Sequence, residues 1–471
     1  MAAGVNLSVA GMVLAMTTGL FGAVDGGKTA GAFAPEEFAV ARSGRRVVTW
    51  FRHKGDPAWG DERIDYVDRF SVVKPVDGDA PERPLLVVLH WRGAGWPGKG
   101  VDMQTSLSDD KDRVFSAPDD FYILNLDDIR DYNVLLNRTH DQYWWGATPR
   151  YAGPEASDVP RLAKGETPCE KRVLASIEWT LKRYAIDRDR VYLCGNSMGG
   201  QAAEAIGLNH GEIFAAVNAN VPATVWFAAA RLGLVNDDGS PREDAAVGPS
   251  VDPPFLVEWS GVDDKWSRDR DVIVEGLRRR HWAHLVLWGD YGHCGLVSEA
   301  RRKNDLIEKF DWLALKRNEA YPVFTDATSD DVLPWPFSVF EPKRASFSGW
   351  KGDIESAKMQ IAAGAKSVGQ INGFFRWRVL ADSDAGFEIE LRLASAEELE
   401  TEHFVPPERT TATVGVRRIQ SAAIAGAKRL EWSYDGRCGA VERDGSGSFA
   451  IPRLEIARTP QILRLTPSTL R

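Results

Sequence analysis

Cysteine is scarce in this chain, with four residues among 471. So few cysteines exclude a fold built on disulfides, and their spacing matches no metal-ligand pattern. Cys194 lies inside a short apolar run, where we interpret it as a small core residue. The sequence therefore predicts neither a disulfide framework nor a bound metal.

Basic residues are fewer than acidic ones, and long apolar runs are rare. The chain has 58 basic and 67 acidic residues, a net charge of −9, which argues against nucleic acid as a partner. Only residues 5–24 form a long uncharged apolar stretch, and no other run is long enough to span a membrane. We interpret residues 1–34 as a signal peptide or a disordered tail. The first interpretation predicts a secreted or periplasmic protein, and the second a cytoplasmic one.

Short apolar runs that alternate with helical patterns are abundant between residues 35 and 324. Strands are expected over 84–90, 121–126, 191–194, 214–218, 255–260 and 284–288. Helices are expected over 170–184, 272–282 and 299–316. Because strands that alternate with helices pair in parallel, this region predicts an α/β domain.

The pattern changes after residue 325. Residues 325–370 are rich in Pro, Ser, Asp and Gly and are interpreted as a linker or irregular segment. Residues 371–471 contain short runs of period two with turn signals between them. This region therefore predicts a small C-terminal all-β domain that resembles a sandwich.

Residues 191–206 are the most informative stretch. Residues 191–194 are apolar enough for a buried strand, and residues 201–206 are helix formers. Ser197 lies between them, surrounded by three glycines: Gly195, Gly199 and Gly200. A serine at such a strand–turn–helix apex is typical of a nucleophile, and the N–H of Met198 at the helix start can bind an oxyanion. The alternative is an ordinary glycine-rich turn.

A second oxyanion donor is expected after the strand that ends at His90. The loop Trp91-Arg92-Gly93-Ala94-Gly95 follows this strand directly. Loops at the end of a central strand supply such donors in α/β enzymes. We expect the donor N–H to come from Arg92 or, failing that, from Trp91; the alternative is a plain turn.

A serine nucleophile needs a base and a carboxylate that orients it. Of the eight histidines, His293 alone lies in a glycine-rich loop after a late strand, so it is the candidate base. Asp264 follows the strand between those of Ser197 and His293 and is the candidate acid, with Asp263 as the alternative. Residues 218–236 contain no Asp or Glu, which excludes an acid after the preceding strand.

A long polar and aromatic stretch over 127–167 contains Trp144 and Trp145. Two interpretations stay open for these tryptophans: a wall of the substrate cleft, or a clamp that holds the stretch against the body. Asn196 and His90, which flank the proposed nucleophile and oxyanion loop, are also candidate substrate contacts.

The order Ser197, Asp264, His293, each after a strand, resembles that of the α/β-hydrolase superfamily. Residues 45–320 are similar to this superfamily as a whole. Residues 186–200 are similar to its polyhydroxybutyrate-depolymerase, feruloyl-esterase and acetyl-xylan-esterase-like branch and to the neighbouring prolyl-oligopeptidase-like branch. One departure is Trp91, where the family usually has glycine. The resemblance implies a mostly parallel central sheet with helices on both faces, to which the C-terminal all-β domain is an addition.

The resemblance also implies a serine hydrolase that cleaves small-molecule or polysaccharide esters through an acyl-enzyme, without cofactor or metal. A peptidase of the prolyl-oligopeptidase-like type is the alternative. Such peptidases usually carry an N-terminal propeller, whereas roughly 45 residues precede the first expected strand. This difference favours the esterase. A third possibility is a catalytically silent binding protein whose β domain mediates attachment.

Overall fold

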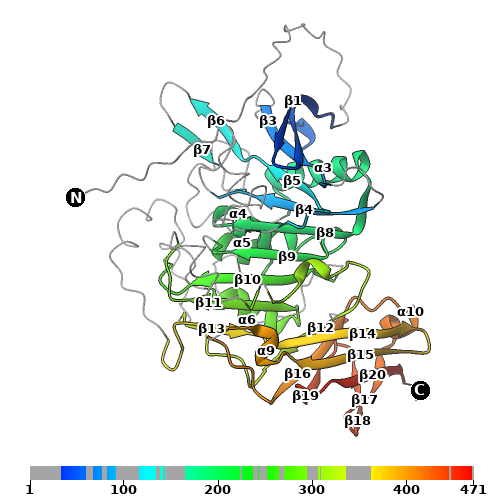
Figure 1. Cartoon of the computed structure of the whole chain (residues 1–471). Coiled ribbons are helices and arrows are strands. Elements are labelled where there is room, and N and C mark those ends of the chain that lie inside the picture. The colour runs from blue at the N-terminus through cyan, green and yellow to red at the C-terminus, as the bar shows by residue number, and fades with distance from the viewer. Residues whose placement is uncertain are drawn as a thin grey trace.

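A ten-stranded sheet runs through the centre of the computed structural model (Figure 1). The structure describes residues 33–59, 67–76, 82–91, 115, 117–133, 138–141, 144, 165–222, 225–236, 242, 252–264, 270–293, 306–307, 309–335, 362–401, 403–444 and 447–468. The strand order of the sheet is β1-β2-β3-β5-β4-β8-β9-β10-β11-β13.

The middle of this sheet is parallel, as the alternation of strands and helices predicts. Its strands are almost wholly buried because both faces are covered. They are β5 (Tyr122–Leu126), β4 (Arg83–Leu89), β8 (Ile186–Asn196), β9 (Ala216–Asn220), β10 (Phe255–Gly261) and β11 (His284–Gly289). Antiparallel strands extend both edges: β1 (Glu36–Ser43), β2 (Arg46–Lys54), β3 (Val67–Val73) and β13 (Gly369–Ile371).

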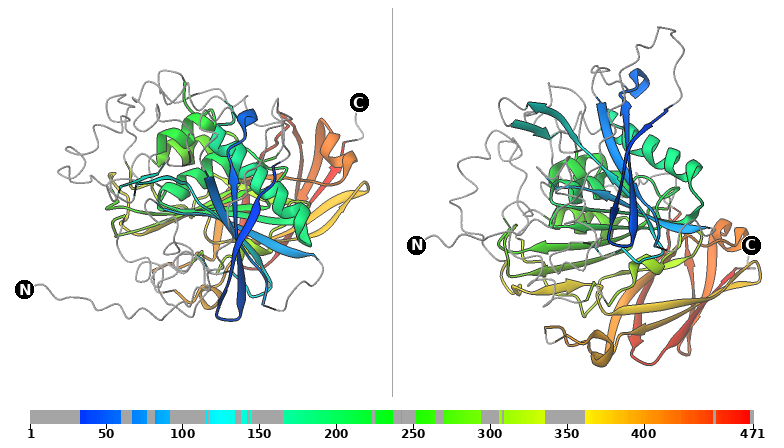
Figure 2. Two further views of the ribbon diagram at one scale, coloured as in Figure 1. Left: turned by 90° about the horizontal axis from the view of Figure 1, so that it is seen from above. Right: turned by 45° about the horizontal axis from the view of Figure 1, so that its top comes forward.

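The two faces of the sheet have different coverings. Alternate residues of β4 point to opposite faces, so Leu85 and Val87 belong to one apolar cluster and Leu86 and Val88 to another. The first cluster packs against helices α3 (Pro168–Arg183), α4 (Met198–Ala202) and α6 (Asp271–Arg279). The second includes residues of the C-terminal strands, which lie on the opposite side from α3 in the right-hand view of Figure 2. Helices were expected on both faces; among the described residues α3, α4 and α6 lie on the first, and the second is covered largely by the C-terminal strands.

The helix expected over 299–316 is not formed over 309–316; residues 299–305 and 308 lie outside the described residues. Within the described part of this range, only a 3-10 turn is formed, at Trp312–Ala314. Phe310 stacks on Phe255 with ring centroids 5.2 Å apart, and Tyr192 donates its hydroxyl hydrogen to the carbonyl of Leu315 at 2.8 Å. These tertiary contacts hold the segment in an irregular path that a continuous helix would not allow.

The C-terminal strands form two antiparallel sheets (Figure 1, yellow to red). One contains β12 (Tyr321–Thr325), β16 (Arg409–Arg417) and β19 (Ile451–Ala457). The other contains β14 (Phe375–Ser383), β15 (Gly386–Leu393), β20 (Gln461–Pro467), β17 (Arg429–Tyr434) and β18 (Arg437–Glu442). Phe324 and Phe375 stack between the two sheets with ring centroids 3.8 Å apart. A separate domain over 371–471 stays a prediction, because β12 precedes that range and β13 joins the central sheet.

The N-terminal stretch lies outside the described residues up to position 32, so the signal peptide stays a prediction. Among the residues that the structure does describe, no helix combines the length and the apolar character that crossing a bilayer requires.

Candidate active site

Ser197 lies at the apex between β8 and α4, as the glycine pattern predicts. Its backbone has φ 56° and ψ −114°, a region that a residue with a side chain enters only at a cost of about 1–3 kcal/mol. The backbone N–H of Ser197 donates to the carbonyl of Asn220 at 2.9 Å. This bond to the neighbouring strand β9 holds the strained turn in place.

The glycines around Ser197 are required by close backbone contacts. A Cβ atom on Gly195 would lie 2.0 Å from the carbonyl oxygen of Gly199. One on Gly199 would lie 2.0 Å from the carbonyl oxygen of Leu89. The turn therefore packs directly on the end of β4, next to the loop where the second oxyanion donor is expected.

The side chains of Ser197, His293 and Asp264 come together at one rim of the sheet. The hydroxyl oxygen of Ser197 lies 2.6 Å from Nε2 of His293, and Nδ1 of His293 lies 2.8 Å from Oδ2 of Asp264. Because a carboxylate only accepts, Nδ1 carries the ring hydrogen and Nε2 presents a lone pair to the hydroxyl. Asp264 is fully buried, whereas Ser197 is 9% exposed.

Two strand ends position the histidine and the aspartate. β10 and β11 are parallel neighbours, and beyond them the N–H of Val262 donates to the carbonyl of Gly289 at 2.8 Å. The N–H of Asp263 donates to the carbonyl of Tyr291 at 3.1 Å, while the Asp263 residue is exposed. The structure therefore brings Asp264, and not its neighbour, to His293.

Of the three predicted oxyanion donors, the structure describes Met198 and Trp91. Met198 is buried and occupies the first position of α4, where an N–H has no partner within the helix. Trp91 follows β4 and is half-buried. Arg92 lies outside the described residues, so its role stays a prediction.

Of the predicted substrate contacts, the structure describes Trp144, His90 and Asn196. Trp144 is fully buried, and its indole N–H donates to the carbonyl of His90 at 3.2 Å. It is therefore a clamp on the end of β4 and not a wall of a cleft. His90 is buried as well, and Asn196 accepts a hydrogen bond from the side chain of Asn220 at 2.6 Å. Trp145 lies outside the described residues.

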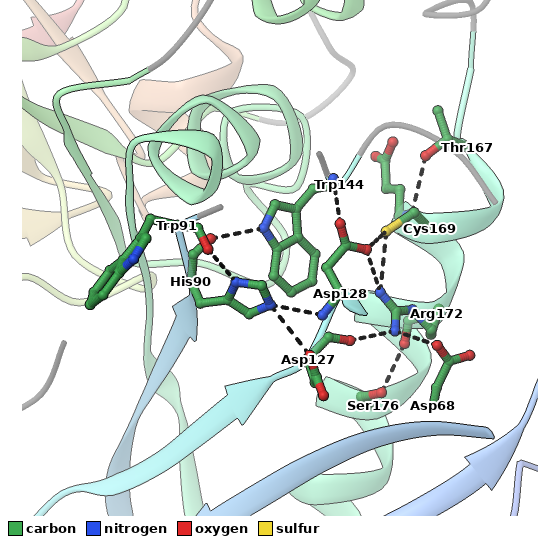
Figure 3. A network of polar contacts seen from close by, with 11 residues as sticks. Asp68, His90, Trp91, Asp127, Asp128, Trp144, Thr167, Cys169, Arg172 and Ser176 are labelled. Carbon is green, nitrogen blue, oxygen red and sulfur yellow. Dashed lines mark hydrogen bonds and ion pairs between the residues drawn. The ribbon is translucent and has the colours of Figure 1, made fainter. Parts of the chain in front are cut away.

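Two buried charged residues beside this clamp are absent from the sequence-based predictions (Figure 3). Asp128 accepts from the backbone N–H of Trp144 at 2.9 Å and from the guanidinium of Arg172 at 3.0 Å. Arg172 also donates to Asp68 at 2.7 Å. The position of Asp128, two residues after the strand that ends at Leu126, is a signal that could have singled it out.

A second buried charge cluster joins the π-helix Ala203–Gly207, which continues α4, to β10. Arg270 donates to both carboxylate oxygens of Glu258, at 2.8 and 2.6 Å, and also contacts Glu204. All three side chains are completely buried. Burial raises the pKa of Glu204 to about 8, an effect that Arg270 reduces and Glu258 reinforces.

The segment that carries Ser197 is similar to a known protein family. The Prolyl oligopeptidase family matches residues 164–232, a segment that includes Ser197 and the whole of α3, β8 and α4. The resemblance to the α/β-hydrolase superfamily is confirmed. No curated protein matches the chain.

Solved structures of this superfamily are similar at low identity. An S-formylglutathione hydrolase from Agrobacterium tumefaciens is 12% identical with a TM-score of 0.39, over 58% of this chain and 97% of that one. A Pyrococcus horikoshii acylaminoacyl peptidase is 15% identical with a TM-score of 0.35, over 60% of this chain and 42% of that one. A CE1 ferulic acid esterase from Anaeromyces mucronatus is 16% identical with a TM-score of 0.32, over 58% of this chain and 90% of that one.

The described residues contain no group of His, Cys, Asp and Glu side chains that could hold a metal ion. That the protein works without metal or cofactor stays a prediction.

Proposed function

We propose that this protein is a serine hydrolase that cleaves carboxylic esters through an acyl-enzyme. Ser197 is the nucleophile, His293 the general base and acid, and Asp264 the carboxylate that orients His293. The observation that supports this proposal is the continuous hydrogen-bonded chain from hydroxyl to imidazole to buried carboxylate, with distances of 2.6 and 2.8 Å. In this arrangement a hydroxyl can lose its proton as it attacks.

The proposed reaction has two symmetric halves. Ser197 Oγ attacks the ester carbonyl carbon as its proton passes to Nε2 of His293. The N–H of Met198 and one N–H of the loop after β4 stabilise the oxyanion, and loss of one such donor costs about 10²–10³ in kcat. The C–O bond then breaks, and His293 gives the proton to the leaving alcohol. A water molecule then attacks the acyl-enzyme by the same steps, with His293 again taking and returning the proton, and the carboxylic acid is released.

Peptide hydrolysis is the second candidate. The match of residues 164–232 to the Prolyl oligopeptidase family favours it. The same three residues would act on an amide, with His293 protonating an amine instead of an alcohol. The sequence similarity of residues 186–200 to esterase branches is the reason for placing esters first.

The finer features of the function are proposals as well. Polysaccharide esters and polyesters are the substrates that the esterase branches suggest, and the interpretation of residues 1–34 as a signal peptide would place the protein outside the cytoplasm. Assays with matched p-nitrophenyl esters and p-nitroanilides of acetyl, feruloyl, longer acyl and peptidyl groups separate the two candidates. A higher kcat/KM for the anilides would favour the peptidase.

Ser197→Ala is the first test. We expect kcat for a p-nitrophenyl ester to fall by roughly 10⁴-fold or more, because no other group replaces the nucleophile. We also expect a fluorophosphonate probe to add once to the wild-type protein and not to the variant, as measured by intact mass. Ser383→Ala, an exposed serine of β14, is the control and should keep both properties. Turnover that survives in Ser197→Ala rules out the proposed nucleophile, and a wild-type protein that the probe does not label supports a silent scaffold.

A further inference from the structure

Asp128 connects three elements at the end of β4 (Figure 3). Its carboxylate accepts from the backbone N–H of Trp144 at 2.9 Å, and its own backbone N–H donates to Nε2 of His90 at 2.9 Å. Arg172 of helix α3 donates to the same carboxylate at 3.0 Å. Asp128 therefore contacts both an imidazole ring and the backbone of Trp144, and the carboxylate of Asp127 lies 3.5 Å from the same Nε2.

The histidine and the tryptophan each hold a carbonyl of the chain that leaves β4. Because Nε2 of His90 accepts from Asp128, its Nδ1 carries the hydrogen and donates to the carbonyl of Trp91 at 2.6 Å. The indole N–H of Trp144 donates to the carbonyl of His90 at 3.2 Å. Two successive peptide groups are thus fixed by side chains that Asp128 positions.

These two peptide groups are the ones from which the second oxyanion donor is expected. A trans peptide is planar, and its N–H points opposite to its C=O. A hydrogen bond that fixes the carbonyl of His90 therefore sets the direction of the Trp91 N–H. In the same way, the hydrogen bond from His90 fixes the carbonyl of Trp91, the last residue that the structure describes before the rest of the loop. The expected donor therefore belongs to a segment whose start is held in place by this group of side chains.

We propose that Asp128, acting through His90 and Trp144, is a positioning residue that aims the oxyanion-binding N–H of the loop after β4. We call these three residues the oxyanion clamp; the proposal rests on the function proposed above. Asp128 and Trp144 are completely buried, and His90 is nearly so. We therefore expect the clamp to act through the backbone at the end of β4 and not by direct contact with substrate.

Further contacts restrict the movement of the residues of the oxyanion clamp. Trp144 has φ 59°, a strained conformation for a residue with a side chain, and the hydrogen bond from its N–H to Asp128 holds it there. The imidazole of His90 lies edge-on to the indole of Trp144 with ring centroids 5.1 Å apart. The guanidinium of Arg172 lies 5.7 Å from the centre of the indole ring. Packing of this kind leaves little freedom for the carbonyls to turn away.

Asp128→Asn tests the proposal because it keeps the size of the side chain and replaces one acceptor by a donor. Either the N–H of Trp144 or the guanidinium of Arg172 then faces an NH₂ group, and the clamp loosens. We expect kcat for a p-nitrophenyl ester to fall by roughly 10- to 100-fold with KM within about two-fold, since a small misplacement affects the transition state most. The affinity for a boronic acid that forms a tetrahedral adduct should fall in parallel.

Asp68→Asn is the matched control. Asp68 is also a buried carboxylate bonded to Arg172, at 2.7 Å, but it belongs to β3 and lies outside the oxyanion clamp. Loss of either carboxylate should lower the melting temperature, and a merely structural role for Asp128 predicts equal kinetics in the two variants. We expect Asp68→Asn to keep kcat within about two-fold of the wild-type value.

Trp144→Phe is the second variant, for use where Asp128→Asn does not fold. It removes the indole N–H but keeps an aromatic ring, and we expect the same selective fall in kcat. Equal kcat in Asp128→Asn, Asp68→Asn and the wild type, or equal kcat in Trp144→Phe and the wild type, overturns the proposal. A wild-type protein that neither hydrolyses the ester nor reacts with a fluorophosphonate overturns the proposed function instead, so the two failures are distinct.

Discussion

At the scale of single residues, we expect the buried carboxyl group of Glu204 to make the stability of the protein depend on pH. Glu204 and Glu258 share the single cation Arg270, and none of the three reaches solvent. Two buried carboxylates against one guanidinium leave an excess negative charge, which is costly in a medium of low polarity. A proton on Glu204 removes this excess, in agreement with its pKa of about 8.

Glu204→Gln should therefore flatten the dependence of stability on pH. The ordinary pKa of a glutamate is 4.5, so between pH 4.5 and 8 the folded wild-type protein holds a proton that the unfolded chain releases. The contribution to stability is complete below pH 4.5 and is lost as the pH rises toward 8. We expect the wild-type protein to lose up to about 1.4 kcal/mol per pH unit relative to the variant, measured by urea unfolding at pH 5, 6.5 and 8.

The control for this measurement is Glu319→Gln, because Glu319 is exposed. Its stability should follow the wild-type curve at every pH. If the curves of Glu204→Gln and the wild type run parallel, the proton is not on Glu204.

Single residues differ in how far the sequence reveals them. Ser197, Asp264 and His293 each lie a few residues after an apolar run, and the structure brings these three side chains together. Arg172 gives no such signal, because it lies next to Val173 on the buried face of an amphipathic helix and its partners are 44 and 104 positions away. Neighbours of that kind exist only once the chain has folded.

At the scale of elements, the turn from β8 to α4 depends on backbone packing more than on side chains. Gly199→Ala should be strongly destabilising, because the added Cβ would lie 2.0 Å from the carbonyl of Leu89, which cannot move without displacing β4. We expect a loss of at least about 1–3 kcal/mol, measured by thermal unfolding, together with loss of esterase activity.

Gly426→Ala is the matched control, since a Cβ on Gly426 would meet nothing within 4 Å. This substitution should be neutral or slightly stabilising. A Gly199→Ala variant with wild-type stability and activity would mean that the turn does not pack on β4 as described.

Elements were predictable where the local pattern decides them. The central strands and helix α3 follow from apolar periodicity; each is present, although β8 begins earlier than expected, at Ile186, and β9 is shifted to Ala216–Asn220. The helix expected over 299–316 is wrong for 309–316, because aromatic contacts decide the path there: Phe310 packs against both Phe255 and Trp377, the latter with ring centroids 5.5 Å apart. Trp377 belongs to β14, a strand far away in sequence, so no local pattern reports this contact.

At the scale of the whole molecule, the C-terminal strands are joined to the α/β body through a shared apolar cluster and a buried arginine. Arg418 follows β16, and its guanidinium donates to the carbonyls of Gly211 at 3.0 Å and Phe214 at 2.8 Å, next to β9. Its backbone N–H donates to Asp252 at 2.8 Å. These partners are 166 to 207 positions away, so the sequence could not indicate that the two parts form one body.

Arg418→Met should therefore lower the stability of the entire protein and not of its C-terminal part alone. The substitution keeps an unbranched chain but leaves buried carbonyls without their donor, at a cost of roughly 2–5 kcal/mol. We expect tryptophan fluorescence and esterase activity to be lost in one shared transition, shifted to lower temperature. Arg409→Met is the control, because Arg409 begins β16, the strand that Arg418 follows, in an exposed ion pair with Glu455 and should change stability by less than about 0.5 kcal/mol. If the C-terminal strands were an independent attachment module, Arg418→Met would instead give two separate transitions, and activity would persist beyond the first.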